Sequence, residues 1–331
     1  MNFQKIVSDI GRINQVEAEA AARRLASPTP TSKTTTFEAI ASGHALDLVW
    51  GFLVPNLHYF AIALGISFLL LNYAFWRLTS VLTRGNPATA KKGSGKRPPP
   101  SEEHPTHLCV VLGSGGHTAE MLTMLRNYPS LLADYTYRTY IVSASDSLSA
   151  IKASDFEKEL AASEEETKSA TEELPDVPSP PPKYDIITIT RARRVHQSIF
   201  TTPMTVTLCL RDCLKVLSGT HKDQSHAASA HTSPDLILTN GPGTGVCVVV
   251  ASIILLFFGA GGSSHDGAYH SSGEMRTIYI ESWARVKTLS LSGWILKPLV
   301  DRFVVQWASL QRKEGEKERG GRAEFVGPLV V

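Results

Sequence analysis

Two glycine-rich turns contain the residues of this sequence whose types and spacing could do chemistry. The first, GSGGHT at Gly113–Thr118, follows an apolar run and precedes apolar residues at helical spacing. Glycines let the backbone turn tightly and come close to a ligand, and the free N–H groups of the following helix favour an anion. This turn predicts a phosphate or pyrophosphate site. A purely structural turn is the alternative, because short motifs also match by chance.

His117 stands at the mouth of the first turn. Because imidazole titrates near neutral pH, His117 could be a general base for a sugar hydroxyl. It could equally orient a phosphate or cap the helix. No Gly-Lys-Ser/Thr follows, which excludes a Walker loop. A dinucleotide fingerprint would need a small residue at Thr118 and an acidic residue about 20 positions later, where only Asp134 is found.

The second turn, TNGPGTG at Thr239–Gly245, has the same strand-to-helix setting. Turns at the carboxyl ends of the strands of a doubly wound sheet face one crevice, so we expect this turn to converge with the first. Tight packing of a helix against the sheet is the alternative.

A basic segment, TRARRVHQS, begins at Thr190 after a predicted strand. Its arginines are Arg191, Arg193 and Arg194, beside His196. Guanidinium forks suit phosphate. A solvated basic loop has the same composition, because an isolated charge run specifies little.

Glu281 and Ser282 follow another predicted strand. Either side chain could hydrogen-bond sugar hydroxyls at the same edge of the sheet. Ser282 could instead be a helix N-cap.

The elements that must position these residues begin near Thr106, where short β-rich runs alternate with helix-like segments. This alternation predicts an α/β fold, a single Rossmann-like doubly wound parallel sheet. The predicted strands are His107–Leu112, Thr136–Ser143, Tyr184–Thr190, Asp235–Thr239, Arg276–Glu281 and Arg302–Trp307. The predicted helices are Gly116–Tyr128, Pro203–Leu217, Gly243–Phe258 and Val286–Leu296.

An apolar stretch precedes this domain. Leu57–Trp76 contains only His58, Ser67 and Asn72 as polar residues and, as a helix, would span about 30 Å, the thickness of a bilayer's hydrocarbon core. Lys and Arg are concentrated after it, whereas Phe37–Asn56 contains neither. These features predict one N-terminal transmembrane helix with the following domain in the cytosol. A buried core helix is the alternative, and a cleavable signal peptide would start nearer the N-terminus.

The chain therefore divides into predicted parts by composition. They are an N-terminal tail at 1–45, a membrane segment at 46–76, a basic Pro/Gly linker at 77–105 and the Rossmann-like domain at 106–331. Within the domain, the acidic segment 155–182 is expected to be a disordered or partly helical loop. A second apolar run, Val246–Phe258, is short for a span and is predicted to be a buried helix or one in shallow contact with a membrane.

Composition also argues against several classes of site. The net charge of +2 makes nucleic acid an unexpected partner. The cysteines show neither a C-x-x-C pair nor zinc spacing. Histidines in the loops Gly219–Pro234 and Gly259–Gly273 are not spaced for a defined site, so no metal is expected.

Five motifs, taken together, resemble a known family. VVLGSGGHTAEM, RARRVHQS, TNGPGTG, IYIESWARVKTLSLSG and DRFVVQW occur in this order behind one membrane segment. They are similar to motifs of the membrane-anchoring subunits of the UDP-N-acetylglucosamine transferase of dolichol-linked oligosaccharide synthesis. The resemblance covers Leu108 to the C-terminus, apart from the acidic segment and the histidine-rich loops. The joint occurrence is specific, whereas any single motif is not.

That family is similar to the N-terminal half of the bacterial glycosyltransferase that adds N-acetylglucosamine to a lipid-linked pyrophosphate. The resemblance implies one half of a two-Rossmann-domain fold, at the cytosolic face of the endoplasmic reticulum membrane, including the nuclear envelope. It implies a soluble catalytic partner subunit, in a heterodimer or larger complex, that holds the UDP-N-acetylglucosamine donor, so that this chain binds no cofactor itself. The implied reaction is inverting transfer of the second N-acetylglucosamine onto N-acetylglucosaminyl-diphosphodolichol in protein N-glycosylation.

Residue by residue, the resemblance implies a site for the pyrophosphate of the acceptor lipid, with His117 as base or positioning residue. The residues expected to bind are Gly113, Ser114, Gly115, Gly116, Thr118, Asn240, Gly241 and Gly243, joined by Arg191, Arg193, Glu281 and Ser282. The family's C-terminal tail docks on the catalytic partner, which here implies an interface at Leu329, Val330 and Val331. A last edge strand is the alternative for this tail.

The leading hypothesis is a subunit that anchors and completes a heteromeric glycosyltransferase and has no activity alone. The alternatives are a pure membrane scaffold with a structural glycine loop and a membrane-bound dinucleotide oxidoreductase.

Overall fold

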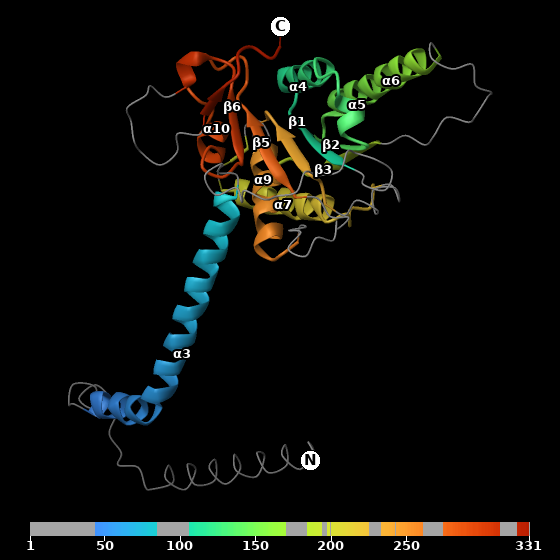
Figure 1. The fold of residues 1–331 in the computed structure, drawn as a ribbon. Helices are drawn as coiled ribbons and strands as arrows, with labels where there is room; N and C mark the ends of the chain where they lie inside the picture. The colour runs from blue at the N-terminus through green and yellow to red at the C-terminus, as the bar shows by residue number, and fades with distance from the viewer. Residues whose placement is uncertain are drawn as a thin grey trace, which may run out of the picture. The chain divides into compact units, whose positions relative to one another are not determined.

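The computed structural model describes residues 44–84, 106–169, 184–193, 197–198, 200–224, 233–241, 243–260, 274–311 and 323–330. The chain divides into two compact units, residues 1–72 and 73–331. The first unit contributes most of helix α3 (His44–Thr83), and the second contains the last turns of α3 and the α/β domain (Figure 1).

Helix α3 is the one helix among the described residues that is long and apolar enough to cross a membrane. The qualifying part is Asn56–Thr83, and its most apolar window is not buried in the protein. Leu64 and Phe75, for example, are 74% and 70% exposed. Apolar side chains exposed all round a helix suit lipid as the surrounding medium. This agrees with the predicted transmembrane helix.

The α/β domain is built on a seven-stranded sheet of order β3-β2-β1-β4-β5-β6-β7. Every neighbouring pair in the sheet is parallel. The strands are β1 (His107–Leu112), β2 (Tyr137–Ser143), β3 (Tyr184–Ile189), β4 (Leu236–Thr239), β5 (Arg276–Ile280), β6 (Arg302–Val305) and β7 (Ala323–Phe325). The predicted Rossmann-like sheet is confirmed, and the six predicted strands agree with β1 to β6 to within two residues at their ends.

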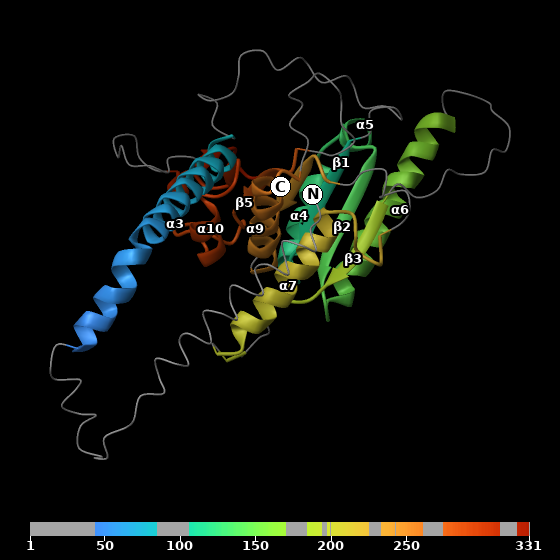
Figure 2. The same cartoon turned by 90° about the horizontal axis from the view of Figure 1, so that it is seen from below.

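Helices cover both faces of this sheet (Figures 1 and 2). On one face lie α4 (Gly116–Arg126), α5 (Leu131–Asp134) and α6 (Ser147–Ser169). On the other face lie α7 (Thr202–Leu217), α9 (Gly243–Phe257) and the short α10 (Leu291–Leu296).

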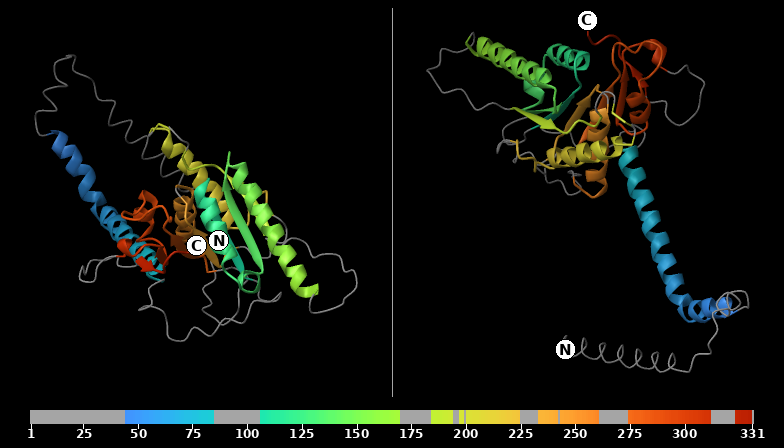
Figure 3. Two further views of the ribbon diagram at one scale, coloured as in Figure 1. Left: turned by 90° about the horizontal axis from the view of Figure 1, so that it is seen from above. Right: turned by 180° about the vertical axis from the view of Figure 1, so that it is seen from behind.

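Strand β1 shows why the sheet is covered on both sides. Its side chains alternate between two cores: Leu108, Val110 and Leu112 join Met121 of α4, while Cys109 and Val111 join the core of α7 and α9. All six residues of β1 are buried. A continuous apolar run is typical of a parallel strand with helices on both faces. Figure 3 shows these layers from two further sides.

Helix α6 includes the first part of the acidic segment 155–182, which agrees with the partly helical alternative up to Ser169. The helix continues to Ser169, and only residues 170–182 of that segment lie outside the described residues. No Gly or Pro occurs between Ser147 and Pro175, and the helix buries Ala153 and Phe156 in the core. Its Glu157 also accepts hydrogen bonds from Arg138 Nε at 2.7 Å and Tyr140 Oη at 2.6 Å. Burial of one face therefore stabilises the helical conformation of this segment.

Helix α10 is shorter than predicted, because its first expected turns form a loop. The side chain of Ser290 accepts a hydrogen bond from the Gly293 N–H at 2.9 Å and so caps the helix at Leu291. Near the C-terminus, β7 ends at Phe325, so the predicted last edge strand is present but shorter than the apolar tail.

Candidate functional site

The two glycine turns meet at the position where the strand order of the sheet reverses. Strand β1 pairs with β2 on one side and with β4 on the other. Gly113 directly follows β1, and Asn240 directly follows β4. Ligands of doubly wound sheets bind in the crevice at the carboxyl ends of the strands beside such a reversal. The predicted convergence of the two turns is confirmed.

The backbones of the two turns are in direct contact. A Cβ atom on Gly113 would lie 2.7 Å from His117 Cβ and 3.3 Å from Gly241 Cα. No side chain fits at Gly113 without displacing one of these turns. Gly115, with a φ of 65°, is the residue before α4 and adopts a backbone conformation that glycine favours.

The amino end of α4 is open to a ligand. Ser114, Gly115 and Gly116 are exposed, and no side chain caps this helix end. Its first turn also contains no acidic residue. Free N–H groups and the helix dipole make such an end favourable for an anion.

Glu120 is the residue of this site that sequence reasoning missed. Its Oε1 accepts hydrogen bonds from the Ser282 hydroxyl at 2.9 Å and from the Trp283 N–H at 3.1 Å. Its Oε2 accepts one from Asn240 Nδ2 at 3.3 Å. One carboxylate therefore joins α4 to the loops that follow β4 and β5. The sequence could have indicated Glu120 by its spacing, because it lies three residues after His117 in HTAEM and therefore on the same face of the predicted helix.

Glu120 is ionised in this setting. Burial opposes its charge, but the neighbouring His117 side chain and the hydrogen bonds from Ser282 and the Trp283 backbone outweigh burial, so the pKa of Glu120 is lowered. Its Oε2 lies 3.8 Å from His117 Nδ1, a distance at which a charged imidazole ring and the carboxylate attract each other.

His117 and Asn240 each present a polar atom without a hydrogen-bond partner among the described residues. These atoms are His117 Nδ1 and Asn240 Oδ1, both buried. The Asn240 side chain is itself held, because its Nδ2 also donates to the His117 carbonyl oxygen at 2.8 Å. A buried polar atom without a hydrogen bond is unfavourable, so these atoms are suited to receive a ligand or water.

Thr118, Ser282 and Glu281 use their side chains within the fold. Thr118 is fully buried and donates to the Gly113 carbonyl oxygen, which closes the first turn. The Ser282 hydroxyl binds Glu120, and no helix starts there, so the N-cap alternative is wrong.

The side chain of Glu281 is 1% exposed. It accepts hydrogen bonds from the Ser290 N–H at 3.0 Å and the Ser290 hydroxyl at 3.2 Å. The predicted contact of Glu281 with sugar hydroxyls is therefore not supported, because burial and these partners occupy its carboxylate.

The basic segment reaches the second turn. A Cβ atom on Gly243 would lie 3.4 Å from Ala192 Cβ, so the loop after β3 packs against the start of α9. Arg191 is half-buried and Arg193 is exposed beside this contact. Arg194 and His196 lie outside the described residues. The structure thus brings Arg191 and Arg193 to the same edge of the sheet as the glycine turns.

The second turn also shows tight packing of a helix against the sheet, which was the alternative to a ligand-binding role for this turn. A Cβ atom on Gly245 would lie 2.4 Å from the Thr239 hydroxyl oxygen. Gly245 therefore serves helix packing, while Asn240 and Gly241 face the first turn.

The C-terminal tail lies against the domain. The Leu329 N–H donates to Gln306 Oε1 at 3.1 Å, and Asn127 Nδ2 donates to the Leu329 carbonyl oxygen at 3.4 Å. Leu329 and Val330 are half-buried, and Val331 lies outside the described residues. Beside this tail, β7 is an edge strand, and Phe325 is 42% exposed.

The described residues contain no group of three or more His, Cys, Asp or Glu side chains that could hold a metal ion. Of the histidines in the predicted His-rich loops, only His221 is described.

A known protein family and several related proteins match most of the chain. The sequence model of a family described as oligosaccharide biosynthesis protein Alg14 like matches residues 108–323. Proteins named UDP-N-acetylglucosamine transferase subunit alg14 are similar: that of Aspergillus fumigatus is 39% identical over 63% of this chain and 100% of its own length. That of Schizosaccharomyces pombe is 35% identical over 72% of this chain and 88% of its own length, and that of Mus musculus is 34% identical over 67% and 82%. No solved structure matches the chain significantly.

Proposed function

The chain belongs to the Alg14 family of oligosaccharide biosynthesis proteins, and on that premise we propose that it is the membrane-anchoring subunit of a UDP-N-acetylglucosamine transferase. In this proposal it recruits a soluble catalytic subunit and binds the lipid-pyrophosphate acceptor. Together the subunits transfer the second N-acetylglucosamine onto N-acetylglucosaminyl-diphosphodolichol. The observation that carries the acceptor site is the contact of the Gly113 and Gly241 turns beneath the open amino end of α4.

The acceptor's pyrophosphate suits this edge of the sheet by charge. Exposed N–H groups at Ser114, Gly115 and Gly116 surround the helix end, and no acidic side chain stands in its first turn. Arg191 and Arg193 flank Ala192, which contacts Gly243 of the neighbouring turn, and they add positive charge to this edge of the sheet. Backbone donors and guanidinium groups are the usual partners of phosphate oxygens.

His117 is the proposed base for the acceptor hydroxyl. In an inverting displacement, the hydroxyl oxygen attacks the anomeric carbon of the donor sugar, the bond from that carbon to the diphosphate breaks, and UDP leaves with the electron pair. The hydroxyl proton passes to His117. Glu120, 3.8 Å from Nδ1, would stabilise the imidazolium that forms.

The donor belongs on the partner in this proposal. A two-Rossmann-domain transferase closes over its substrates with a second sheet, whereas the described residues form one sheet. The exposed edge strand β7 and the half-buried Leu329 and Val330 are the surface we assign to the catalytic partner. An edge strand offers unpaired backbone groups for this contact.

The proposed location is the endoplasmic reticulum membrane, with the α/β domain in the cytosol. It rests on α3 and on the Lys and Arg residues that follow the apolar stretch.

The alternative function is that of a pure membrane scaffold. It is supported by Thr118, Glu281 and Ser282, because their side chains form hydrogen bonds within the protein.

One experiment separates the two functions. The full chain and its catalytic partner are purified together, and both co-purification and transfer to the acceptor lipid are measured for wild type and His117→Ala. We expect normal co-purification and a loss of transfer of about 100-fold or more. Full transfer with normal co-purification would remove His117 from the mechanism. We also expect the chain without its partner to transfer no sugar.

A further inference from the structure

Arg77 of α3 holds the carboxyl end of α9. Its Nη2 donates to the Leu256 carbonyl oxygen at 2.7 Å, and its Nε donates to the Phe257 carbonyl oxygen at 3.1 Å. The last carbonyls of a helix have no partner within the helix, and the helix dipole favours a cation there. Arg77 therefore fixes the last turn of α9 beside one particular turn of α3.

Arg77 also marks the end of the apolar stretch of α3. No Asp, Glu, Lys or Arg occurs between Asp47 and Arg77. Just before it, Tyr73 and Trp76 are 60% and 63% exposed. Aromatic residues followed by a basic residue are typical of the boundary between hydrocarbon and headgroups. The last turn of α9 is thus held at the level of that boundary.

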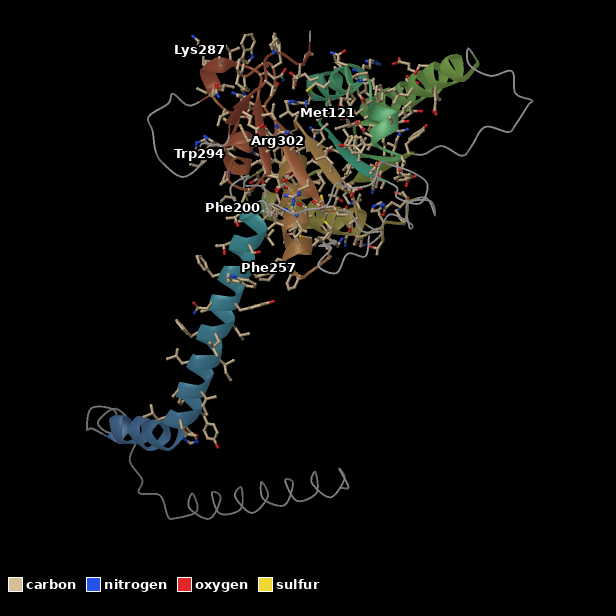
Figure 4. All side chains as sticks on the ribbon, in the orientation of Figure 1. Met121, Phe200, Phe257, Lys287, Trp294 and Arg302 are labelled. Carbon is tan, nitrogen blue, oxygen red and sulfur yellow. The ribbon has the colours of Figure 1, made fainter. Side chains whose placement is uncertain are left out.

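Helix α9 ends in an apolar surface, which we call the α9 tip and define as Leu255, Leu256, Phe257 and Phe258. The earlier part of α9 is a core helix with Cys247, Val248, Val249 and Ala251 buried. The tip differs, because Leu255, Leu256 and Phe257 are only partly buried and Phe258 is 80% exposed. Figure 4 shows Phe257 at the carboxyl end of this helix. No charged residue occurs from Gly243 to Ala260.

A second contact keeps α3 from sliding past the domain. Arg84 Nη2 lies 3.0 Å from Asp301 Oδ2, and Arg84 Nη1 donates to the Glu274 carbonyl oxygen at 2.9 Å. Val81, one turn earlier, is buried. Together Arg77, Val81 and Arg84 join the last turns of α3, which belong to the second unit, to α9 and to the residues around β5 and β6.

We propose that the α9 tip inserts into the interfacial layer of the bilayer that α3 spans. The proposal rests on the membrane anchoring described under the proposed function. It follows from the contact of Arg77 with the tip, the aromatic residues beside Arg77 and the absence of charge on the tip. The α9 tip would then be a second contact of the protein with the membrane, in addition to the span of α3.

The test places a fluorescent label on the tip of the full-length protein. The four native cysteines are buried, so a Phe258→Cys variant can be labelled selectively. The control is Ile151→Cys on α6, where Ile151 is a 56% exposed apolar residue at the opposite side of the sheet. Both proteins are reconstituted into vesicles of phosphatidylcholine and phosphatidylserine, with brominated lipid or aqueous iodide as quencher.

We expect brominated lipid to quench the label at position 258 at least about twofold more than the label at 151, and iodide to show the reverse order. Equal quenching at both positions by each reagent would overturn the proposal. Protection of position 258 from iodide in native microsomes, without quenching by brominated lipid in vesicles, would assign the tip to a protein partner and equally overturn it.

Flotation with the same vesicles tests separately whether α3 anchors the protein, which the proposed insertion of the α9 tip requires. Failure of the full chain to float with vesicles would contradict anchoring by α3. Arg77→Gln in the Phe258→Cys background is expected to float normally and to lose the excess quenching by brominated lipid. Unchanged quenching in this variant would contradict the role of Arg77.

Discussion

Gly113 and Gly241, which are far apart in the sequence, approach so closely that a Cβ atom on Gly113 would lie 3.3 Å from Gly241 Cα. The contact exists because β1 and β4 are neighbours in the sheet. It brings the open end of α4, His117 and Asn240 together at the carboxyl edge of the sheet.

Gly113→Ala is expected to reduce sugar transfer strongly in the complex. The added Cβ atom would lie 2.7 Å from His117 Cβ, so the His117 ring or the Gly241 turn must move. Overpacking of this kind costs about 1–3 kcal/mol of stability. Transfer and thermal unfolding are measured together with Gly65→Ala as the matched control, because a Cβ atom on Gly65 meets nothing within 4 Å. Transfer at the wild-type rate by Gly113→Ala would argue against the crevice as the acceptor site.

Glu120→Gln is expected to change how stability depends on pH. The pKa of Glu120 lies below its ordinary value of 4.5 in the folded protein, because the partners of the carboxylate outweigh its burial. The ionised form therefore stabilises the fold above pH 4.5, and this contribution is lost as the pH falls through the lowered pKa. Denaturant unfolding of wild type and variant should differ most near neutral pH and converge in acid. A constant difference at all pH values would mean that the Glu120 charge does not stabilise the fold.

Arg138→Met is expected to destabilise the protein by about 3–5 kcal/mol, because Glu157 would remain buried without its cation. The side chains of Arg138 and Glu157 are 6% and 2% exposed, and their closest atoms are 2.7 Å apart. Lys158→Met is the control, since the Lys158–Asp155 pair is exposed and should contribute less than about 1 kcal/mol. Denaturant midpoints of the full chain in detergent check this. Similar losses in both variants would refute the distinction between buried and exposed pairs.

Deletion of residues 1–80 is expected to release the protein from membranes. The deletion removes the apolar part of α3 and Arg77, and of the two proposed membrane contacts it leaves only the few residues of the α9 tip. Fractionation into pellet and supernatant measures the outcome. If the truncated protein stayed entirely in the membrane pellet, α3 would not be the sole anchor, and Phe257 and Phe258 would be the next residues to replace.

Most of the fold was predictable because its signals are local. The six predicted strands are apolar runs bounded by turns, and their positions agree with β1 to β6. The predicted bounds differ from the structure where tertiary contacts determine the end of an element. Helix α6 extends to Ser169, into the acidic segment, and buries Phe156 in the core, and α10 starts late because Glu281 and Ser290 hold the preceding loop.

The site was predictable only in part. The glycine turns and His117 follow strands and open helices, which is visible along the chain. Glu120 was missed because its partners, Asn240 and Ser282, are more than a hundred residues away. The burial of Glu281, likewise, cannot be read from its neighbours in the sequence.

The sequence by itself determined the apolar span, the alternating strands and helices, and the two glycine turns, since each depends on residues within one local stretch. Only the tertiary structure decided that Glu120 joins the turns to the loop after β5, and that Arg77 caps α9. These contacts depend on the order in which parallel strands pair and on how α3 docks. Strand pairing and helix docking both depend on how much apolar surface the whole domain buries, and a short stretch of sequence does not carry that information.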